Sequence, residues 1–170
     1  MSVDGEKGTR DSRPPTWGGR LWRYGPVVAW ACFVLYASSG NFSASNTSRI
    51  IRPLLVWLFP DISEAALVQA HFLVRKAAHF VEYALLALLA ARAFRTSSRP
   101  PLARRWRLAS FALAASVALV DEYHQSLVPA RTGTIYDSLL DMAGGAAALA
   151  CASLWLAARR WKAGGAARVG

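Results

Sequence analysis

The apolar residues of this chain gather into long runs and do not recur at the spacing of an amphipathic surface helix. Three runs have spanning length, namely residues 21–39, 77–91 and 135–158. A fourth run, residues 108–128, reaches the roughly 20 residues that a membrane-crossing helix needs only when it includes a polar cluster near its end. The pattern therefore predicts an all-α integral membrane bundle of four transmembrane helices.

The connection between the first two predicted spans is long, at residues 40–74. Within it, residues 50–59 are strongly apolar but too few to cross a bilayer, so we expect a re-entrant or interfacial segment. Residues 62–72 are expected to form a short helix with Ser63 as its N-cap, because serine is a favoured capping residue.

The composition favours the membrane class over the soluble one, since 54% of the residues are hydrophobic and only 18% are charged. The chain is long enough for one domain. We expect a disordered basic tail at residues 1–20, a membrane domain at residues 21–160 and a second basic tail at residues 161–170.

The net charge of +10 raises the question of a nucleic-acid partner, but the distribution of the charge argues against one. Arginines stand at the ends of apolar runs, and no basic helix with interleaved aromatic residues is present. Both tails and the connection at residues 92–107 are rich in basic residues, so the positive-inside rule predicts that they are cytoplasmic. We therefore expect a multi-pass protein of the cytoplasmic (inner) membrane, with the lipid bilayer as its first partner.

This orientation places three polar clusters in the outer half of the membrane. On the second span, Lys76, His79 and Tyr83 share one helical face, and Glu82 lies beside it. Ionisable groups are costly in hydrocarbon, at about 2.5–3.5 kcal/mol each near a helix centre, so this face should turn inward. The sequence leaves two readings open here: a buried network that holds the helices together, or a proton donor or ligand for an anionic headgroup.

The third span ends in the polar stretch from Asp121 to Gln125. Five consecutive residues exceed one helical turn, so they cannot all face inward. We expect Glu122 and Gln125 to face the bundle, with Asp121 and His124 nearer the interface. In the following turn, Arg131 could clamp a phosphate or carboxylate, or form a simple ion pair with an acid of this stretch.

The fourth span begins with acidic and small residues in line. Asp137, Asp141, Gly144 and Ala148 follow one helical face, which predicts close packing against another helix. The potential ligands of the three clusters show no dense pair spacing typical of a metal site, and Ser126 and Ser138 lack the context of a hydrolase nucleophile. The sequence therefore predicts neither a metal nor a cofactor.

Three stretches, K-A-A-H-F-V-E-Y-A-L-L, D-E-Y-H-Q-S-L-V-P-A-R-T-G and I-Y-D-S-L-L-D-M-A-G-G, together resemble the VanZ-like family of bacterial membrane proteins. They cover roughly residues 75–148, and their order and spacing make the resemblance specific. The family usually has Pro-Gly-Arg in the turn, where this chain has Ala130 before Arg131. The namesake of the family is associated with resistance to the glycopeptide teicoplanin. For this chain the resemblance implies membrane location and the shared polar positions, and it implies no reaction.

The leading hypothesis is an outward-facing polar pocket that binds, and could modify, an anionic envelope lipid or cell-wall precursor. A small proton-coupled transporter and a non-catalytic structural partner are the alternatives, and the sequence does not decide whether the protein is an enzyme. The candidate catalytic residues are Glu122, His79 and Asp141, and the candidate substrate-binding residues are Lys76, Glu82, Gln125, Arg131 and Asp137.

Overall fold

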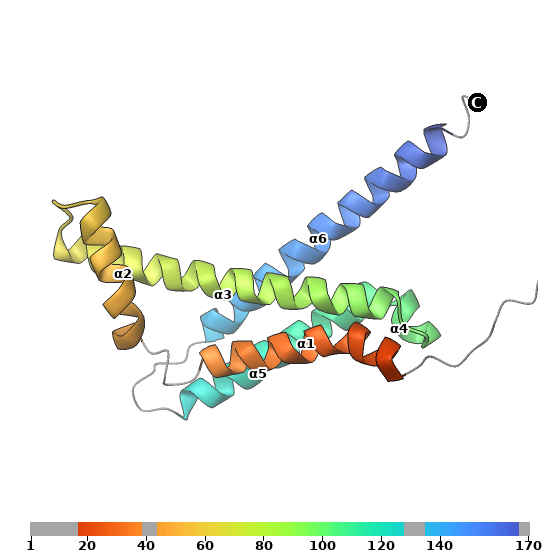
Figure 1. Cartoon of the computed structure of the whole chain (residues 1–170), viewed down its shortest axis with the longest axis horizontal. Coiled ribbons are helices and arrows are strands. Elements are labelled where there is room, and N and C mark those ends of the chain that lie inside the picture. Colours follow the sequence, from red (N-terminus) through yellow and green to blue (C-terminus); the bar gives the residue numbers. More distant parts are fainter. Residues whose placement is uncertain (1–16, 39–43, 128–134, 167–170) are drawn as a thin grey trace, which may run out of the picture.

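The computed structural model describes residues 17–38, 44–127 and 135–166. In these residues the fold is entirely helical, as the hydrophobic pattern predicts (Figure 1). In chain order the helices are α1 (Trp17–Ala37), α2 (Ala44–Leu58), α3 (Glu64–Arg95), α4 (Pro100–Arg104), α5 (Trp106–Ser126) and α6 (Ile135–Ala166).

The central element is α3, which contacts every other described helix. Ser63 caps it as expected, because its side chain accepts a hydrogen bond from the backbone N–H of Ala66 at 3.2 Å. The prediction of a short helix over residues 62–72, separate from the second span, is wrong. The two segments form one helix of 32 residues, because neither proline nor glycine interrupts the sequence between Glu64 and Arg95.

Small side chains let the helices approach closely around α3. Most of the buried residues of α3 are alanines, and α5 meets them with Ala114 and Ala118. On α6, Gly144 lies directly against the backbone of Phe80. Without a strong hydrophobic force between helices in lipid, such close packing is a main source of association. The predicted small-residue face of this helix is therefore a packing face at Gly144.

The first helix runs antiparallel to α3. The Tyr24 hydroxyl forms a hydrogen bond with Ser97 Oγ at 2.8 Å, and the indole N–H of Trp30 donates to the backbone oxygen of Glu82 at 3.0 Å. Moving forward along α1 therefore means moving backward along α3. This arrangement brings Trp30, in the second half of α1, to the level of Glu82.

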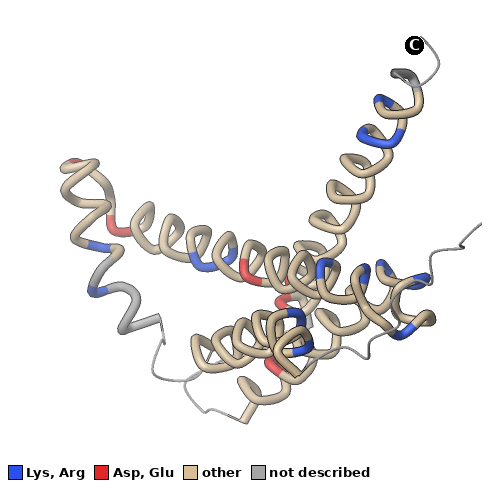
Figure 2. The backbone as a smooth tube through the Cα atoms, turned by 45° about the vertical axis from the view of Figure 1, so that its right-hand side comes forward, with Lys and Arg blue, Asp and Glu red and all other residues tan. Residues whose placement is uncertain are grey.

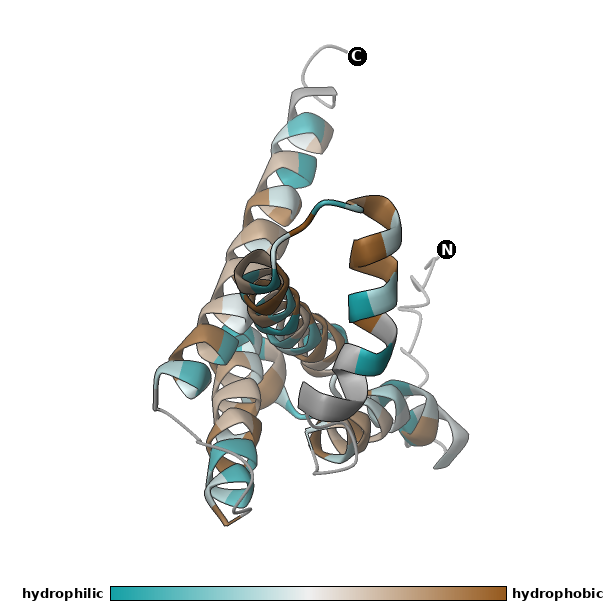
Figure 3. Cartoon of the chain, turned by 90° about the vertical axis from the view of Figure 1, so that its left-hand side faces the viewer, coloured by the Kyte–Doolittle hydropathy of each residue, from teal (hydrophilic) through white to brown (hydrophobic). Residues whose placement is uncertain are grey.

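The segment predicted as interfacial is a helix, α2, which contains Pro53. Figure 3 shows α2 lying across the direction of α3 and carrying strongly hydrophobic residues toward its end. Arg52 pairs with Glu64, which ties α2 to the first turn of α3. Leu54 and Trp57 are exposed, which is the behaviour expected of a helix whose environment is partly lipid.

Two helices among the described residues are long and apolar enough to cross a membrane, Glu64–Arg95 and Tyr136–Gly164. The helices at the other two predicted spans, α1 and α5, are each 21 residues long. The helices at both ends extend beyond the bounds expected for the membrane domain. The first helix starts at Trp17, inside the stretch expected to be disordered, and α6 continues to Ala166, past the expected start of the C-terminal tail.

Candidate functional site

Polar side chains from three helices meet at one level of the bundle. Because α5 runs opposite to α3, and α6 runs with it, the start of α6 and the end of α5 both reach the middle of α3. We call this set the polar cluster; its members are Lys76, His79, Glu82 and Tyr83 on α3, Asp121, Glu122 and Gln125 on α5, and Asp137, Ser138 and Asp141 on α6.

An ion pair between Lys76 and Asp137 forms the edge of the polar cluster. Both side chains are partly exposed, at 27% and 29%. The Lys76 ammonium also lies 5.2 Å from the centre of the Phe72 ring, close enough for a cation–π contact. The ammonium has three donors, so the pair with Asp137 does not exhaust its capacity for a further anion.

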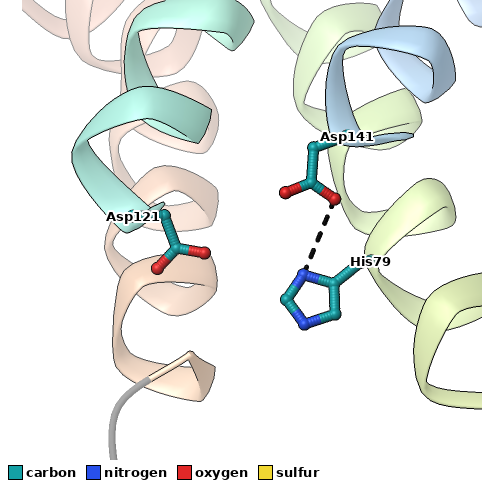
Figure 4. Close-up of side chains that lie close together, drawn as sticks. All are labelled: His79, Asp121 and Asp141. Carbon is teal, nitrogen blue, oxygen red and sulfur yellow. Dashed lines mark ion pairs between the residues drawn. The ribbon is translucent and has the colours of Figure 1, made fainter. Parts of the chain in front are cut away.

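The centre of the polar cluster is the triad of His79, Asp121 and Asp141, one residue from each of α3, α5 and α6 (Figure 4). His79 Nδ1 lies 3.6 Å from Asp141 Oδ1. One ligand atom of each residue lies within 4.8 Å of those of the other two. Asp121 is 1% exposed and Asp141 is 4% exposed, so both carboxyl groups are inside the bundle. The figure shows the Asp141 carboxyl group next to the His79 ring, with Asp121 facing both from the neighbouring helix.

The Asp121 carboxyl group is held in place by two donors. The Gln125 side-chain amide donates to Asp121 Oδ2 at 2.9 Å, and the Tyr83 hydroxyl donates to the same oxygen at 3.4 Å. Tyr83 is completely buried. This carboxyl group therefore has a fixed orientation.

The expectation that Asp121 lies near the interface is wrong. It is one of the most deeply buried side chains of the described part, while Glu122 is only partly buried and His124 is exposed. Gln125 is buried, as expected. The signal that finds Asp121 is the stripe of small residues before it, since Ser110, Ala114 and Ala118 share its helical face and are buried too.

The remaining polar residues of this region differ in their positions. The Glu82 side chain is partly buried beside the triad, and its backbone oxygen accepts the hydrogen bond from Trp30. Ser138, to which the sequence assigned no role, is 1% exposed, and its hydroxyl has no hydrogen-bond partner among the described residues. Arg131 and the turn that carries it lie outside the described residues.

Comparison with known proteins shows the family of the chain. A family model described as VanZ/LLP1 matches residues 24–156, which span most of α1 through α6. The chain belongs to the VanZ/LLP1 family. Its resemblance to that family is thereby confirmed, and with two helices apolar enough to cross a bilayer it is a VanZ-like membrane protein. No curated protein and no solved structure matches the chain.

In this VanZ/LLP1 protein, carboxyl groups outnumber cations at the polar cluster. The negative charges of Asp121, Glu82 and Glu122 all act on Asp141, and Lys76 opposes them. Lys76 is already paired with a carboxylate of its own, Asp137. The described part of the cluster is therefore an acidic environment with one cation at its rim.

Proposed function

We propose that this VanZ-like protein binds an anionic component of the cell envelope, a lipid-linked phosphate or a wall precursor, at the polar cluster. In this proposal α1, α3, α5 and α6 all cross the cytoplasmic membrane, with both termini inside. The cluster then opens toward the outer leaflet, where such components are assembled and used.

The observation that carries the proposal is the convergence of charged side chains from three helices on one level. Each such group costs free energy in a bilayer, so ionisable residues within membrane helices mark functional sites by default. The Lys76 ammonium is the described cation best placed for an incoming anion, because it lies at the partly exposed edge of the cluster.

The distribution of basic residues supports the outward orientation. Figure 2 shows many of the Lys and Arg residues around α4 and near the free end of α6, with others on α2 and in the middle of α3. Arg92 and Arg95 close α3 at the end toward α4. Under the positive-inside rule that end is cytoplasmic, so the polar cluster belongs to the opposite half of the membrane.

A purely structural role would leave the polar groups satisfied by one another. Fully satisfied networks are the stabilising ones, and a partly satisfied network is costly in a low-dielectric interior. Among the described residues, the buried Asp141 Oδ1 accepts no hydrogen bond, its contact with His79 being 3.6 Å long, and the buried Ser138 hydroxyl has no hydrogen-bond partner. These unfilled hydrogen-bonding positions support a cluster that binds a further group.

The direct test measures binding to the full chain reconstituted in lipid nanodiscs. Polyprenyl phosphate is the probe, and an uncharged polyprenol of the same length reports lipid partitioning alone. We expect Lys76→Gln to weaken binding of the phosphate, while Arg92→Gln, which removes a cation from the other end of α3, leaves it unchanged. Equal binding of phosphate and polyprenol by the unsubstituted protein would refute the proposal.

A cellular test uses the same two variants expressed at equal abundance in a bacterium that lacks the chromosomal copy. The proposal predicts that Lys76→Gln changes glycopeptide tolerance or the envelope lipid profile, and that Arg92→Gln behaves as the unsubstituted protein. If both variants match the unsubstituted protein in both readouts, an envelope-binding role at Lys76 is excluded.

A further inference from the structure

We propose that His79, Asp121 and Asp141 form a binding site for a divalent metal ion, with Zn²⁺ the ion that best suits the donors. The inference deepens the proposed function: the bound metal ion presents an open coordination position to a phosphate oxygen of the envelope component. Only this identification of the phosphate rests on the proposed function. Metal binding itself is a property of this chain and is tested alone.

The geometry of the triad is close to that of a three-ligand zinc site. Zinc binds histidine nitrogen and carboxylate oxygen at about 2.0–2.2 Å, so two ligand atoms of a tetrahedral site lie about 3.3–3.6 Å apart. His79 Nδ1 and Asp141 Oδ1 already stand 3.6 Å apart. The longest separation between the ligand atoms of the triad is no more than 4.8 Å. A side-chain rotation that moves a carboxylate oxygen by about 1 Å therefore completes the site.

The chemistry of the donors favours a borderline metal over a hard one. Imidazole suits Zn²⁺ and other transition metals, whereas Mg²⁺ and Ca²⁺ prefer sites built only from oxygen. Three protein ligands leave the fourth position of a tetrahedral ion open, which is the pattern of zinc sites that act on other molecules. A purely structural zinc site would use all four positions.

Burial and hydrogen bonding point to a ligand at this place. Asp141 is 4% exposed, its Oδ1 accepts no hydrogen bond from the part of the chain that the structure describes, and this carboxyl group faces the His79 ring and Asp121 (Figure 4). Gln125 and Tyr83 fix Asp121 from behind, as outer-shell donors fix carboxylates that bind metals.

The charge of the polar cluster gives an independent reason. Glu82, Asp121 and Glu122 add their negative charges around Asp141, and Lys76 is shared with Asp137. An uncompensated excess of carboxylates in a bilayer is unfavourable, and a divalent cation at the triad cancels two charges. The same cation resolves a conflict in the proposed function, since an acidic cluster repels a phosphate unless a positive ion stands between them.

The test is a Zn²⁺ titration of the purified full chain in detergent, after treatment with a chelator and without envelope lipid. We expect one Zn²⁺ per chain by calorimetry and elemental analysis. Co²⁺ put in its place should give the strong visible absorption of a four-coordinate site. The matched pair of variants is Asp121→Asn and Glu122→Gln, which each remove one negative charge at neighbouring positions.

Coordination predicts that Asp121→Asn weakens Zn²⁺ binding by more than about 100-fold, while Glu122→Gln changes it by less than about tenfold. A second pair, His79→Gln and His124→Gln, should divide in the same way, because His124 is exposed at the end of α5. Size-exclusion profiles and circular dichroism establish that each variant is folded. If a variant does not fold, the stoichiometry and the Co²⁺ spectrum of the unsubstituted chain still decide the question.

Three outcomes overturn the metal site: no Zn²⁺ bound by the unsubstituted chain, equal losses for Asp121→Asn and Glu122→Gln, or Ca²⁺ and Mg²⁺ binding as tightly as Zn²⁺. The last two would show only a diffuse acidic cluster. Adding polyprenyl phosphate in nanodiscs then separates the two proposals. Zn²⁺ binding without phosphate binding refutes the proposed function and keeps the metal site. Phosphate binding by a chain that binds no Zn²⁺ refutes the metal site and keeps the proposed function.

Discussion

The close approach of α6 to the backbone of α3 makes a sharp prediction about Gly144. A Cβ built at this position would stand 3.1 Å from the Phe80 carbonyl carbon and 3.2 Å from its Cα, with the carbonyl oxygen nearer still. These are backbone atoms of α3, so they cannot turn aside as a side chain would. Gly144→Ala must therefore push α6 away from α3 by about 1 Å to restore ordinary contact.

The cost of this displacement can be estimated from overpacked cores, where extra methyl groups destabilise by about 1–3 kcal/mol. For a chain of this size each kcal/mol lowers the melting temperature by about 2–4 °C, so the expected loss is about 2–12 °C. Because Asp141 lies one turn before Gly144, the same shift lengthens its 3.6 Å approach to His79 by about 1 Å. Zn²⁺ affinity should fall together with stability.

The assay is thermal unfolding of the purified protein in detergent, followed by tryptophan fluorescence, with Gly145→Ala as the matched control. At Gly145 a Cβ would meet Ala87 at 3.5 Å, Ala114 at 3.6 Å and the Tyr83 oxygen at 3.7 Å, which are ordinary contacts. Gly145→Ala should therefore melt no lower than the unsubstituted protein, and up to about 4 °C higher because alanine favours the helix more than glycine does. Equal melting temperatures for the two variants would show that α3 and α6 do not pack as described.

Three further changes test other contacts. Trp30→Phe removes the donor to the Glu82 backbone oxygen and should lower the free energy of unfolding by about 0.5–1.5 kcal/mol, measured by denaturant titration in detergent. Lys76→Asp should destabilise strongly, by roughly 3–5 kcal/mol, because it leaves two acids together, and adding Asp137→Lys should restore most of the loss. Gln125→Ala frees one side of the Asp121 carboxyl group and should weaken Zn²⁺ binding by about 10–100-fold, measured by calorimetry.

Each of these changes has a control at a site without the contact. Trp22→Phe alters an exposed tryptophan and should leave stability unchanged, so an equal effect of both tryptophan changes would reject the role of the indole bond. A double variant at Lys76 and Asp137 no more stable than Lys76→Asp would contradict the ion pair. Ser126→Ala, next to Gln125 but exposed, should keep full Zn²⁺ affinity.

The sequence predicted the helices well because apolar runs and caps are local signals. All-helical architecture, the cap at Ser63 and the packing face at Gly144 follow from residues close together in the chain. The length of α3 was underestimated, since the hydrophobic pattern weakens at Arg75 and Lys76 although nothing there interrupts a helix. Hydropathy predicts which residues lie in the lipid, whereas helix propensity determines where the helix begins and ends.

The candidate site was predicted in its membership but not in its geometry. Residue spacing along one helix shows which side chains share a face, and this brought His79 and Asp141 into view. It does not show which atoms of three helices meet, so the spacing argument against a metal could not detect a triad with one member on each helix. Asp121 was misplaced for the same reason: the identity of its neighbours depends on how α5 is rotated against α3 and α6.

The ion pair between Lys76 and Asp137 joins residues that are 61 positions apart, and this separation matters while the protein is being made. At a synthesis rate of about 5–20 residues per second, Asp137 follows Lys76 out of the ribosome by about 3–12 seconds. During this interval α3 carries an ammonium, an imidazole and a carboxyl group with none of their α6 partners available. The hydrophobicity of α3 must hold the helix at the membrane until α6 is made. The packing of α3 against α6 is therefore a late step of assembly. A chain truncated before α6 should be recognised as unassembled and degraded.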